Sequence, residues 1–190
     1  MTKKATITKE MILDAAFRLL RERGIESVNA RSIAESLGCT TQPVMYHFGS
    51  VQKLKEELYA RADGYHTEYL MTPAEGYDDA MLGLGVNYIR FAQNEKAIFR
   101  FLFQSDGFGQ KNIGDLTSEP SLSPIINIFS GAAGLTAEQA RRLFSCLFFA
   151  VHGIASLLAN NSMIYNENYT ADIVREIYRS VFAEIKGDAI

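Results

Sequence analysis

Apolar residues recur every three to four positions along nearly the whole chain, which is the spacing of amphipathic helices. The segment that follows Thr8 shows this spacing clearly and stops at Gly24, with one face formed by Ile12, Ala15, Ala16, Leu19 and Leu20. The sequence contains neither strand-type alternation nor internal repeats. The pattern therefore predicts an all-α fold of about nine helices.

Three further helices are predicted in the N-terminal third. A short helix is expected over residues 31–37, where Gly38 ends it, and a second over 41–48 with Pro43 in its first turn, where a missing N–H is harmless. After Gly49 and Ser50, the spacing predicts a longer helix over residues 51–71. The turn signal at 72–76 then marks a boundary between two folded parts.

The C-terminal part also shows helical spacing. Helices are expected over 78–93 and 96–104, and a Gly-, Ser-, Asp- and Pro-rich loop over 105–124. A capping-box pattern, Thr136 with Gln139, opens a helix that reaches about residue 160. A last helix runs from about residue 170 to Gly187, with apolar residues every four positions at Ile173, Ile177, Val181 and Ile185.

Composition places the chain among globular proteins, with 190 residues, 47% of them hydrophobic and 22% charged. The net charge of -3 hides an asymmetry. Residues 1–62 hold 10 Lys and Arg against 7 Asp and Glu, whereas residues 63–190 hold 9 against 15. A basic N-terminal third on an acidic remainder indicates two parts with different partners.

The sequence contains no motif that is typical of several other classes of protein. Cys39 and Cys146 are too few for a disulfide framework, and no nucleophile motif, Gly-rich phosphate loop or metal-spaced cluster appears. An enzyme is therefore not expected, and neither a cofactor nor a metal. The N-terminus shows no apolar signal core, which indicates a cytoplasmic protein. The uncharged stretch 143–166 contains His152 and several Ser and Asn, so a buried helix is favoured over a membrane span.

Residues 31–48 have the organisation of a helix-turn-helix. Gly38 allows a tight turn, and the two helices can pack through Ile33, Ala34, Leu37, Val44 and Phe48. The second helix offers short polar groups where such a helix meets base edges, namely Thr40, Thr41, Gln42, Tyr46 and His47. On spacing alone, a polar surface helix on an all-helical protein fits equally well.

The same residues carry a family resemblance. Arg31-Ser-Ile-Ala-Glu-Ser-Leu-Gly38, followed by Tyr46-His-Phe-Gly-Ser50, resembles the DNA-binding domain of the tetracycline-repressor (TetR) family. The resemblance implies a three-helix DNA-binding domain over 1–50 and a helical ligand-binding and dimerisation domain over 51–190, with helix 51–71 connecting them. Segments 88–92, 98–103 and 149–157 resemble one type of ligand-binding domain in this family, although the Trp usually found before His152-Gly153 is absent.

The resemblance assigns DNA contacts position by position. Base or phosphate contacts fall on Arg31, Thr41, Gln42, Pro43, Tyr46 and His47, beside Thr40 from the spacing argument. Two positions depart from the family pattern, because Met45 stands where Tyr is usual and Val51 where Lys is usual. Lys53 is then the candidate for a phosphate contact, with Lys55 close by. Both departures should weaken nonspecific phosphate binding more than specificity.

The remaining candidates concern dimerisation and ligand binding. A homodimer is expected, because one recognition helix reads only a few base pairs. Its interface is assigned to the last two helices, at Cys146, Ala150, Gly153, Ile173, Ile177 and Val181; packing within one subunit is the alternative. Candidate ligand contacts for a largely apolar small molecule are Tyr88, Phe91, Phe99, Phe103, Phe148, Phe149, His152 and Met163, with core packing as the alternative for most of these aromatics. His66 is expected to be exposed.

The sequence thus predicts a regulator that binds a palindromic operator in double-stranded DNA as a dimer. By resemblance, it represses transcription until a small molecule favours a splayed arrangement, with helix 51–71 as the lever. The alternative is a helical dimeric binding module that does not bind DNA, and the departures at Met45 and Val51 keep it open.

Overall fold

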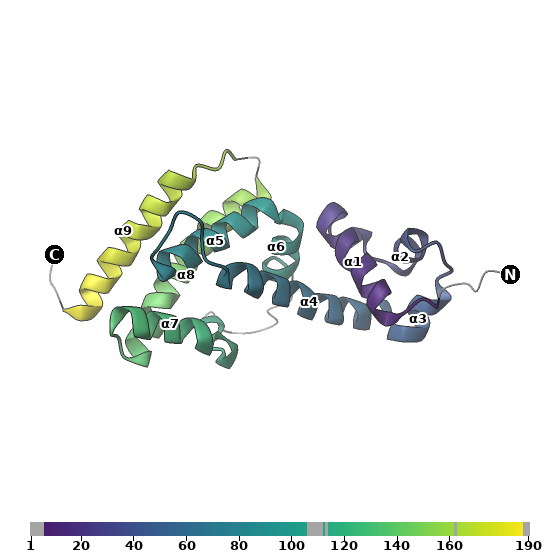
Figure 1. The fold of residues 1–190 in the computed structure, drawn as a ribbon, viewed down its shortest axis with the longest axis horizontal. Helices are drawn as coiled ribbons and strands as arrows, with labels where there is room; N and C mark the ends of the chain where they lie inside the picture. The colour runs from purple at the N-terminus through teal and green to yellow at the C-terminus, as the bar shows by residue number, and fades with distance from the viewer. Residues whose placement is uncertain (1–5, 106–111, 113, 162, 188–190) are drawn as a thin grey trace. The chain divides into compact units, whose positions relative to one another are not determined.

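A computed structural model describes residues 6–105, 112, 114–161 and 163–187, and the regular structure in these ranges is entirely helical (Figure 1). The all-α prediction is confirmed. The α-helices of this part of the chain are α1 (Lys9–Arg23), α2 (Ala30–Ser36), α3 (Gln42–Phe48), α4 (Val51–Met71), α5 (Ala80–Asn94), α6 (Lys96–Phe103), α7 (Ser123–Ala133), α8 (Ala137–Asn160) and α9 (Glu167–Lys186). Short 3-10 turns occur at η1 (Ile25–Ser27), η3 (Asp115–Thr117) and η4 (Pro120–Leu122).

The chain divides into two compact units. Residues 1–67 and 95–107 form the N-terminal unit, and residues 68–94 and 108–190 form the C-terminal unit. Helix α4 begins in the first unit and ends in the second. Helix α6 belongs to the N-terminal unit although it follows α5 directly in sequence. The sequence-based boundary at residue 50 stays a prediction about separable domains.

Local capping explains where the first helices begin and end. The Thr8 hydroxyl accepts a hydrogen bond from the Met11 backbone N–H at 3.2 Å, which opens α1. Gly24 ends it at a φ of 83°, where L side chains are strained. The Asn29 side chain accepts hydrogen bonds from the backbone N–H groups of Arg31 and Ser32 in the first turn of α2. The α1 face expected to be buried is buried, at Ile12, Ala15, Ala16, Leu19 and Leu20.

A buried carboxylate joins three helices of the N-terminal unit. Glu95, 5% exposed, accepts hydrogen bonds from Arg21 Nε at 2.8 Å and Nη2 at 2.5 Å, and from the Tyr65 hydroxyl at 3.0 Å. Arg21 lies on α1, Tyr65 on α4, and Glu95 precedes α6. The bidentate geometry compensates for the desolvation of the carboxylate, so these helices are held together by a fully bonded ion pair.

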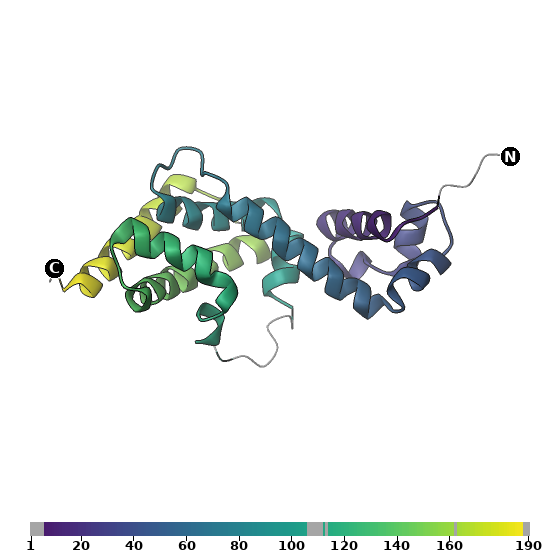
Figure 2. The same ribbon diagram turned by 60° about the horizontal axis from the view of Figure 1, so that its bottom comes forward.

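In the C-terminal unit, α8 is the central helix and packs against α5, α7 and α9 (Figures 1 and 2). Its length and composition would suffice to cross a membrane, and 39% of its most apolar window is buried inside the fold. The capping box at Thr136 and Gln139 is present as predicted. The packing against three neighbours makes α8 a core helix of this unit.

Three local expectations differ from the structure. Helix α7 begins within the expected loop and was not predicted. Helix α9 begins earlier than expected, since Asn166 caps it by accepting from the Tyr169 N–H at 3.1 Å. His66 is buried at 7% exposure, not exposed, because Phe103 of α6 packs edge-on against it with ring centroids 5.0 Å apart.

Candidate nucleic-acid interface and ligand cavity

Helix α3 has a buried face and an exposed polar face. Val44 and Phe48 are 1% and 4% exposed and pack into the N-terminal unit, while Gly38 in the preceding turn has a φ of 62°. Pro43 is half-buried in the first turn of α3. We call the exposed polar residues at and near the start of this helix the reading face. They are Thr40, Thr41, Gln42 and Tyr46.

Tyr46 is the most prominent side chain of this face. It is 83% exposed, and the neighbouring Met45 is 42% exposed. Its ring meets the His47 ring edge to face with centroids 5.2 Å apart, and its exposed hydroxyl is placed to donate to or accept from a partner outside the chain. The predicted reading residues Thr40, Thr41, Gln42 and Tyr46 therefore lie together on one accessible surface.

His47 has a partner within the chain. It is half-buried, and its Nε2 lies 3.0 Å from the Ile7 carbonyl oxygen, to which the ring N–H donates. Lys9 is similarly engaged, since its ammonium pairs with Glu57 at 2.7 Å and lies 5.3 Å from the centre of the Phe48 ring. The bond to Ile7 holds the segment that precedes α1 against α3, and the contacts of Lys9 hold the first residue of α1 against α3 and α4. The structure thus gives His47 a role in ordering this segment, which the sequence pattern did not indicate.

Two exposed cations accompany the reading face. Arg31 lies in the first turn of α2, and Lys53 lies in the first turn of α4. The Ser50 hydroxyl accepts from the Lys53 backbone N–H at 3.1 Å, so this cap fixes where α4 starts. Among the described residues, neither cation forms an ion pair. Both charges are available to a partner, whereas Val51, half-buried, offers none.

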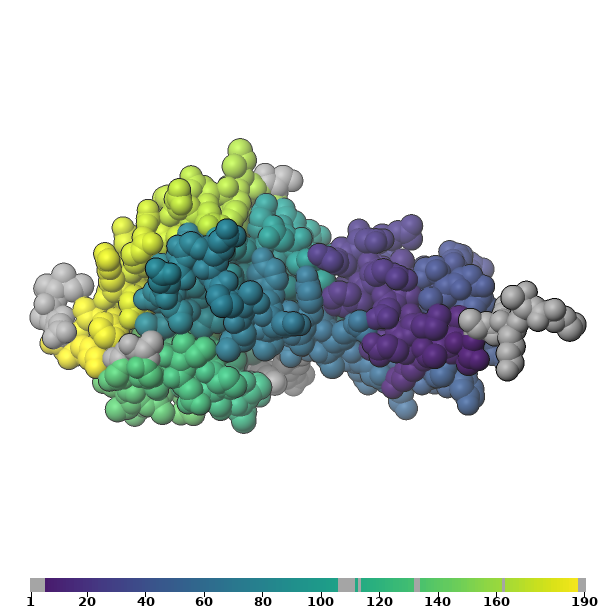
Figure 3. All heavy atoms as spheres, in the orientation of Figure 1, coloured from purple at the N-terminus to yellow at the C-terminus, as the bar shows by residue number. Residues whose placement is uncertain are grey.

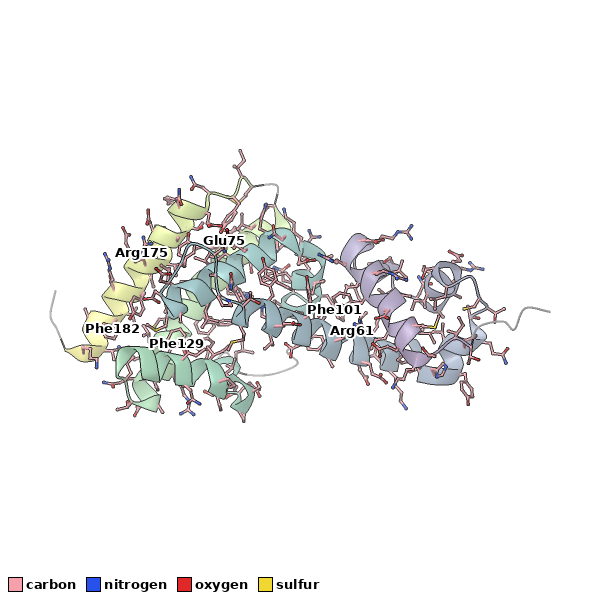
Figure 4. The ribbon with its side chains drawn as sticks, viewed as in Figure 1. Arg61, Glu75, Phe101, Phe129, Arg175 and Phe182 are labelled. Carbon is pink, nitrogen blue, oxygen red and sulfur yellow. The ribbon has the colours of Figure 1, made fainter. Side chains whose placement is uncertain are left out.

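The C-terminal unit contains an apolar cavity with a volume of about 50 Å³. Side chains from five helices line it, since Leu70 comes from α4 and Val174 from α9, and the rest come from α5, α7 and α8. Phe129, labelled in Figure 4, is one of the two contributions of α7. The full lining is Leu70, Met81, Leu84, Gly85, Tyr88, Ile125, Phe129, Phe144, Leu147, Phe148, Val151 and Val174.

Only part of the expected ligand set reaches this cavity. Tyr88 and Phe148 line it. Phe91 is fully buried against Tyr69, with ring centroids 5.3 Å apart, and acts as core. Phe99 and Phe103 lie on α6 in the N-terminal unit. Phe149 and Met163 are 40% and 50% exposed.

His152 contributes indirectly. Its Nδ1 lies 2.8 Å from the Tyr88 hydroxyl, and its ring packs on Phe148 with centroids 5.5 Å apart. Burial lowers the pKa of His152 and raises the pKa of Tyr88, because each loses hydration of its charged form. At neutral pH both groups are therefore uncharged, and a hydrogen bond joins the Tyr88 hydroxyl to Nδ1 of His152.

The expected dimer residues form a partly exposed strip on α8 and α9. Cys146 and Gly153 are exposed and Ala150 is half-buried on one side of α8, flanked by Phe149 and by Leu157, which is 54% exposed. On α9, which lies at the surface of the C-terminal unit (Figure 3), half-buried positions include Ile173, Ile177 and Val181. A Cβ added at Gly153 would meet no atom within 4 Å, so another backbone could approach closely there.

The chain has a short helix, a tight turn and a second helix whose start is exposed and polar. This arrangement defines the helix-turn-helix class of proteins. Residues 12–62 match the model of the family described as "Bacterial regulatory proteins, tetR family". The resemblance that the sequence indicated is therefore confirmed for residues 12–62. This family is described as one of regulatory proteins, which agrees with the expectation that the chain is no enzyme.

Curated relatives match the N-terminal part. Tetracycline repressor protein class D from Escherichia coli and class H from Photobacterium damsela subsp. piscicida are each 31% identical to the chain over 72 residues. These residues make up 38% of this chain and 33% of each relative, so the match spans about a third of the relatives' length.

Solved structures share the fold over most of the chain. A TetR-like transcriptional regulator from Rhodococcus sp. RHA1 has a TM-score of 0.63 at 17% identity, covering 92% of this chain and 95% of that one. A TetR family member from Streptomyces coelicolor A3 has a TM-score of 0.58 at 17% identity, covering 89% and 96%. The multidrug binding protein EbrR, complexed with imidazole, has a TM-score of 0.55 at 15% identity, covering 89% and 88%.

Proposed function

We propose that the chain is a transcriptional repressor that binds a palindromic DNA operator as a dimer and releases it when a small apolar molecule fills the cavity. The observation that carries the proposal is the reading face, whose polar groups are exposed at the start of α3 while Val44 and Phe48 anchor the same helix in the core. This face lies within the residues that match the family model.

DNA recognition divides between two sets of residues. Thr40, Thr41 and Gln42, with Tyr46, contact base edges in the major groove, where short polar side chains can discriminate base pairs. Pro43, in the first turn of α3, contributes apolar contact. Arg31 and Lys53 neutralise phosphates, which sets register and affinity but carries no sequence information. His47 positions the reading face through its bond to Ile7.

The dimer forms through α8 and α9. Their strip of small and apolar residues, from Cys146 to Gly153 and from Ile173 to Val181, allows two such helix pairs to pack as a four-helix bundle. Two recognition helices can then contact half-sites about one DNA turn, 34–36 Å, apart.

Release follows from the connectivity of α4. Leu54 and Leu58 of this helix are fully buried in the N-terminal unit, and Leu70 at its other end lines the cavity. A ligand that binds a widened cavity more tightly displaces this end of α4 and favours an arrangement that no longer matches the half-site spacing. Because its target is chromosomal DNA, the protein acts in the cytoplasm.

Two substitutions test the division of roles on the full-length chain. Gln42→Ala should change the preferred bases, because it removes a donor and acceptor at the base edges. Lys53→Ala should weaken binding to all duplexes alike and reduce the salt slope by about one. Fluorescence anisotropy over a panel of duplexes and salt concentrations measures both, with Asn127→Ala, an exposed amide on α7, as the control that changes neither.

The alternative function has a distinct outcome in the same assay. If the unsubstituted chain shows no salt-sensitive binding to any duplex, the reading face does not contact DNA and the chain is a dimeric helical binding module. If Gln42→Ala and Lys53→Ala behave alike, the division into base readers and phosphate contacts is wrong.

A further inference from the structure

We propose that Asn87 is the positioning residue that couples the cavity to α4. Its side-chain amide binds the end of α4 to α5, the helix that forms one wall of the cavity, so a ligand that displaces α5 displaces the end of α4 with it. The proposal rests on the proposed function, which makes the cavity the effector site, and it names the contact through which a bound effector acts on α4.

The first observation is the cap at the end of α4. Asn87 is 5% exposed, and its Nδ2 donates to the carbonyl oxygen of Thr72 at 2.8 Å. The same nitrogen donates more weakly to the carbonyl oxygens of Tyr69 and Leu70, each at 3.4 Å. Because a carbonyl oxygen only accepts hydrogen bonds, the donor is the amide nitrogen in all three contacts. The last carbonyl groups of a helix have no partner within it, so Asn87 supplies partners that α4 itself lacks.

The second observation is the position of Asn87 on α5. Leu84, Gly85 and Tyr88 of this helix line the cavity, and Asn87 directly precedes Tyr88. Helix α5 also packs against α7, α8 and α9, which supply most of the remaining cavity wall. The same helix therefore contacts the cavity on one face and the end of α4 on another.

The third observation is close packing at two glycines of α5. A Cβ added at Gly83 would lie 3.2 Å from the Cβ of Ala74, in the segment that follows α4. A Cβ added at Gly85 would lie 3.2 Å from Val174 of α9 and 3.5 Å from Val151 of α8. Closely packed elements transmit a displacement instead of absorbing it. A ligand that widens the cavity between α5 and its neighbours therefore pushes α5 against the segment that Asn87 holds.

A double-mutant cycle on the full-length chain tests the coupling without an identified effector. Gly85→Val acts as a wedge, because its side chain needs space that Val174 and Val151 occupy. Gly131→Val is the matched control, since a Cβ added at this position of α7 would meet no atom within 4 Å. Asn87→Leu keeps a side chain of similar size and removes the donor.

Fluorescence anisotropy with a duplex that the unsubstituted chain binds gives the first readout. Gly85→Val should weaken DNA binding roughly tenfold when Asn87 is present, and Gly131→Val should not weaken it. In the Asn87→Leu background, Gly85→Val should change the affinity by less than about twofold. Equal weakening in both backgrounds would overturn the proposal, because a purely structural role of Asn87 gives additive effects. No weakening when Asn87 is present would also overturn it.

A fluorescent reporter gives a second readout that needs no DNA. The chain contains no Trp, so Met71→Trp, at a position of α4 that is 44% exposed, places a single indole in the last turn of this helix. Gly85→Val should shift the emission of this indole when Asn87 is present and leave it unchanged in the Asn87→Leu background. An emission shift of equal size in both backgrounds would overturn the proposal. Circular dichroism checks the helicity of each variant, and Gly85→Ala and Asn87→Ala replace any variant that loses it.

The two readouts separate this proposal from the proposed function. An emission shift that depends on Asn87, without DNA binding by the unsubstituted chain, would contradict the repressor function and support the coupling. DNA binding whose response to Gly85→Val does not depend on Asn87 would do the reverse.

Discussion

The acid sensitivity of the N-terminal unit should depend on His66. This residue of α4 is 7% exposed and packs against Phe103, and burial lowers its pKa from 6.5 to about 4, because the imidazolium would lose its hydration. Its stabilising effect on the fold is present above pH 6.5. It is lost as the pH falls towards 4, since the unfolded chain binds a proton in this range and the folded chain does not.

The magnitude follows from the two pKa values. A difference of about 2.5 units at 1.36 kcal/mol per unit amounts to about 3 kcal/mol between pH 7 and pH 4, an upper limit for this one group. That is a large part of the free energy of unfolding of an ordinary domain, which is about 5–15 kcal/mol.

Urea denaturation at pH 7 and at pH 4.5, followed by circular dichroism, measures this effect. His66→Phe keeps a ring of similar size against Phe103 and cannot titrate, so its stability should fall less between pH 7 and pH 4.5 than that of the unsubstituted chain, by up to about 2.5 kcal/mol. His152 is present in both proteins, and its contribution cancels. Equal losses in both proteins would show that burial of His66 does not set the acid sensitivity.

Three further predictions concern charge pairs and the dimer. Arg90 hydrogen-bonds Glu167 and holds the pKa of this carboxyl below 4.5, so the stability that the pair contributes is present above pH 4.5 and lost below it. Arg90→Gln should therefore reduce the loss of stability between pH 5 and pH 3, as measured by a series of denaturation curves. Arg21→Ala leaves the buried Glu95 carboxylate without its cation and should lower the free energy of unfolding in urea by about 2 kcal/mol, which is more than Glu95→Gln lowers it. A smaller loss for Arg21→Ala than for Glu95→Gln would contradict the assigned pair. Leu157→Glu should convert the dimer to monomer in analytical ultracentrifugation, and an unchanged dimer would exclude this part of α8 from the interface.

The helix-turn-helix could be predicted because the features that define it are local and because residues 31–50 resemble the DNA-binding domain of the TetR family, whereas spacing alone left a polar surface helix equally possible. The cap at Asn29, the turn at Gly38 and the buried Val44 and Phe48 lie within a few residues of one another, so spacing alone specifies which face of α3 is exposed. The part that the sequence did not predict is the partner of His47, since the direction of that ring depends on the segment before α1.

The cavity could be predicted only in part. Aromatic periodicity indicated that Tyr88, Phe91 and Phe148 face inward, but it cannot distinguish a ring that fills the core from a ring beside a void. That difference depends on how α7 and α9 pack against α5 and α8, which are distant from them in sequence for the most part. The burial of His66 likewise results from the packing of Phe103, which is distant in sequence.

The central claim is that two copies of α3 read a palindromic DNA site. Selection of bound duplexes from a random pool by the full-length chain tests it most directly. The pool should converge on one inverted repeat whose half-sites are centred about 10–10.5 base pairs apart or a multiple of this. A pool that shows no enriched sequence after repeated rounds would contradict the claim.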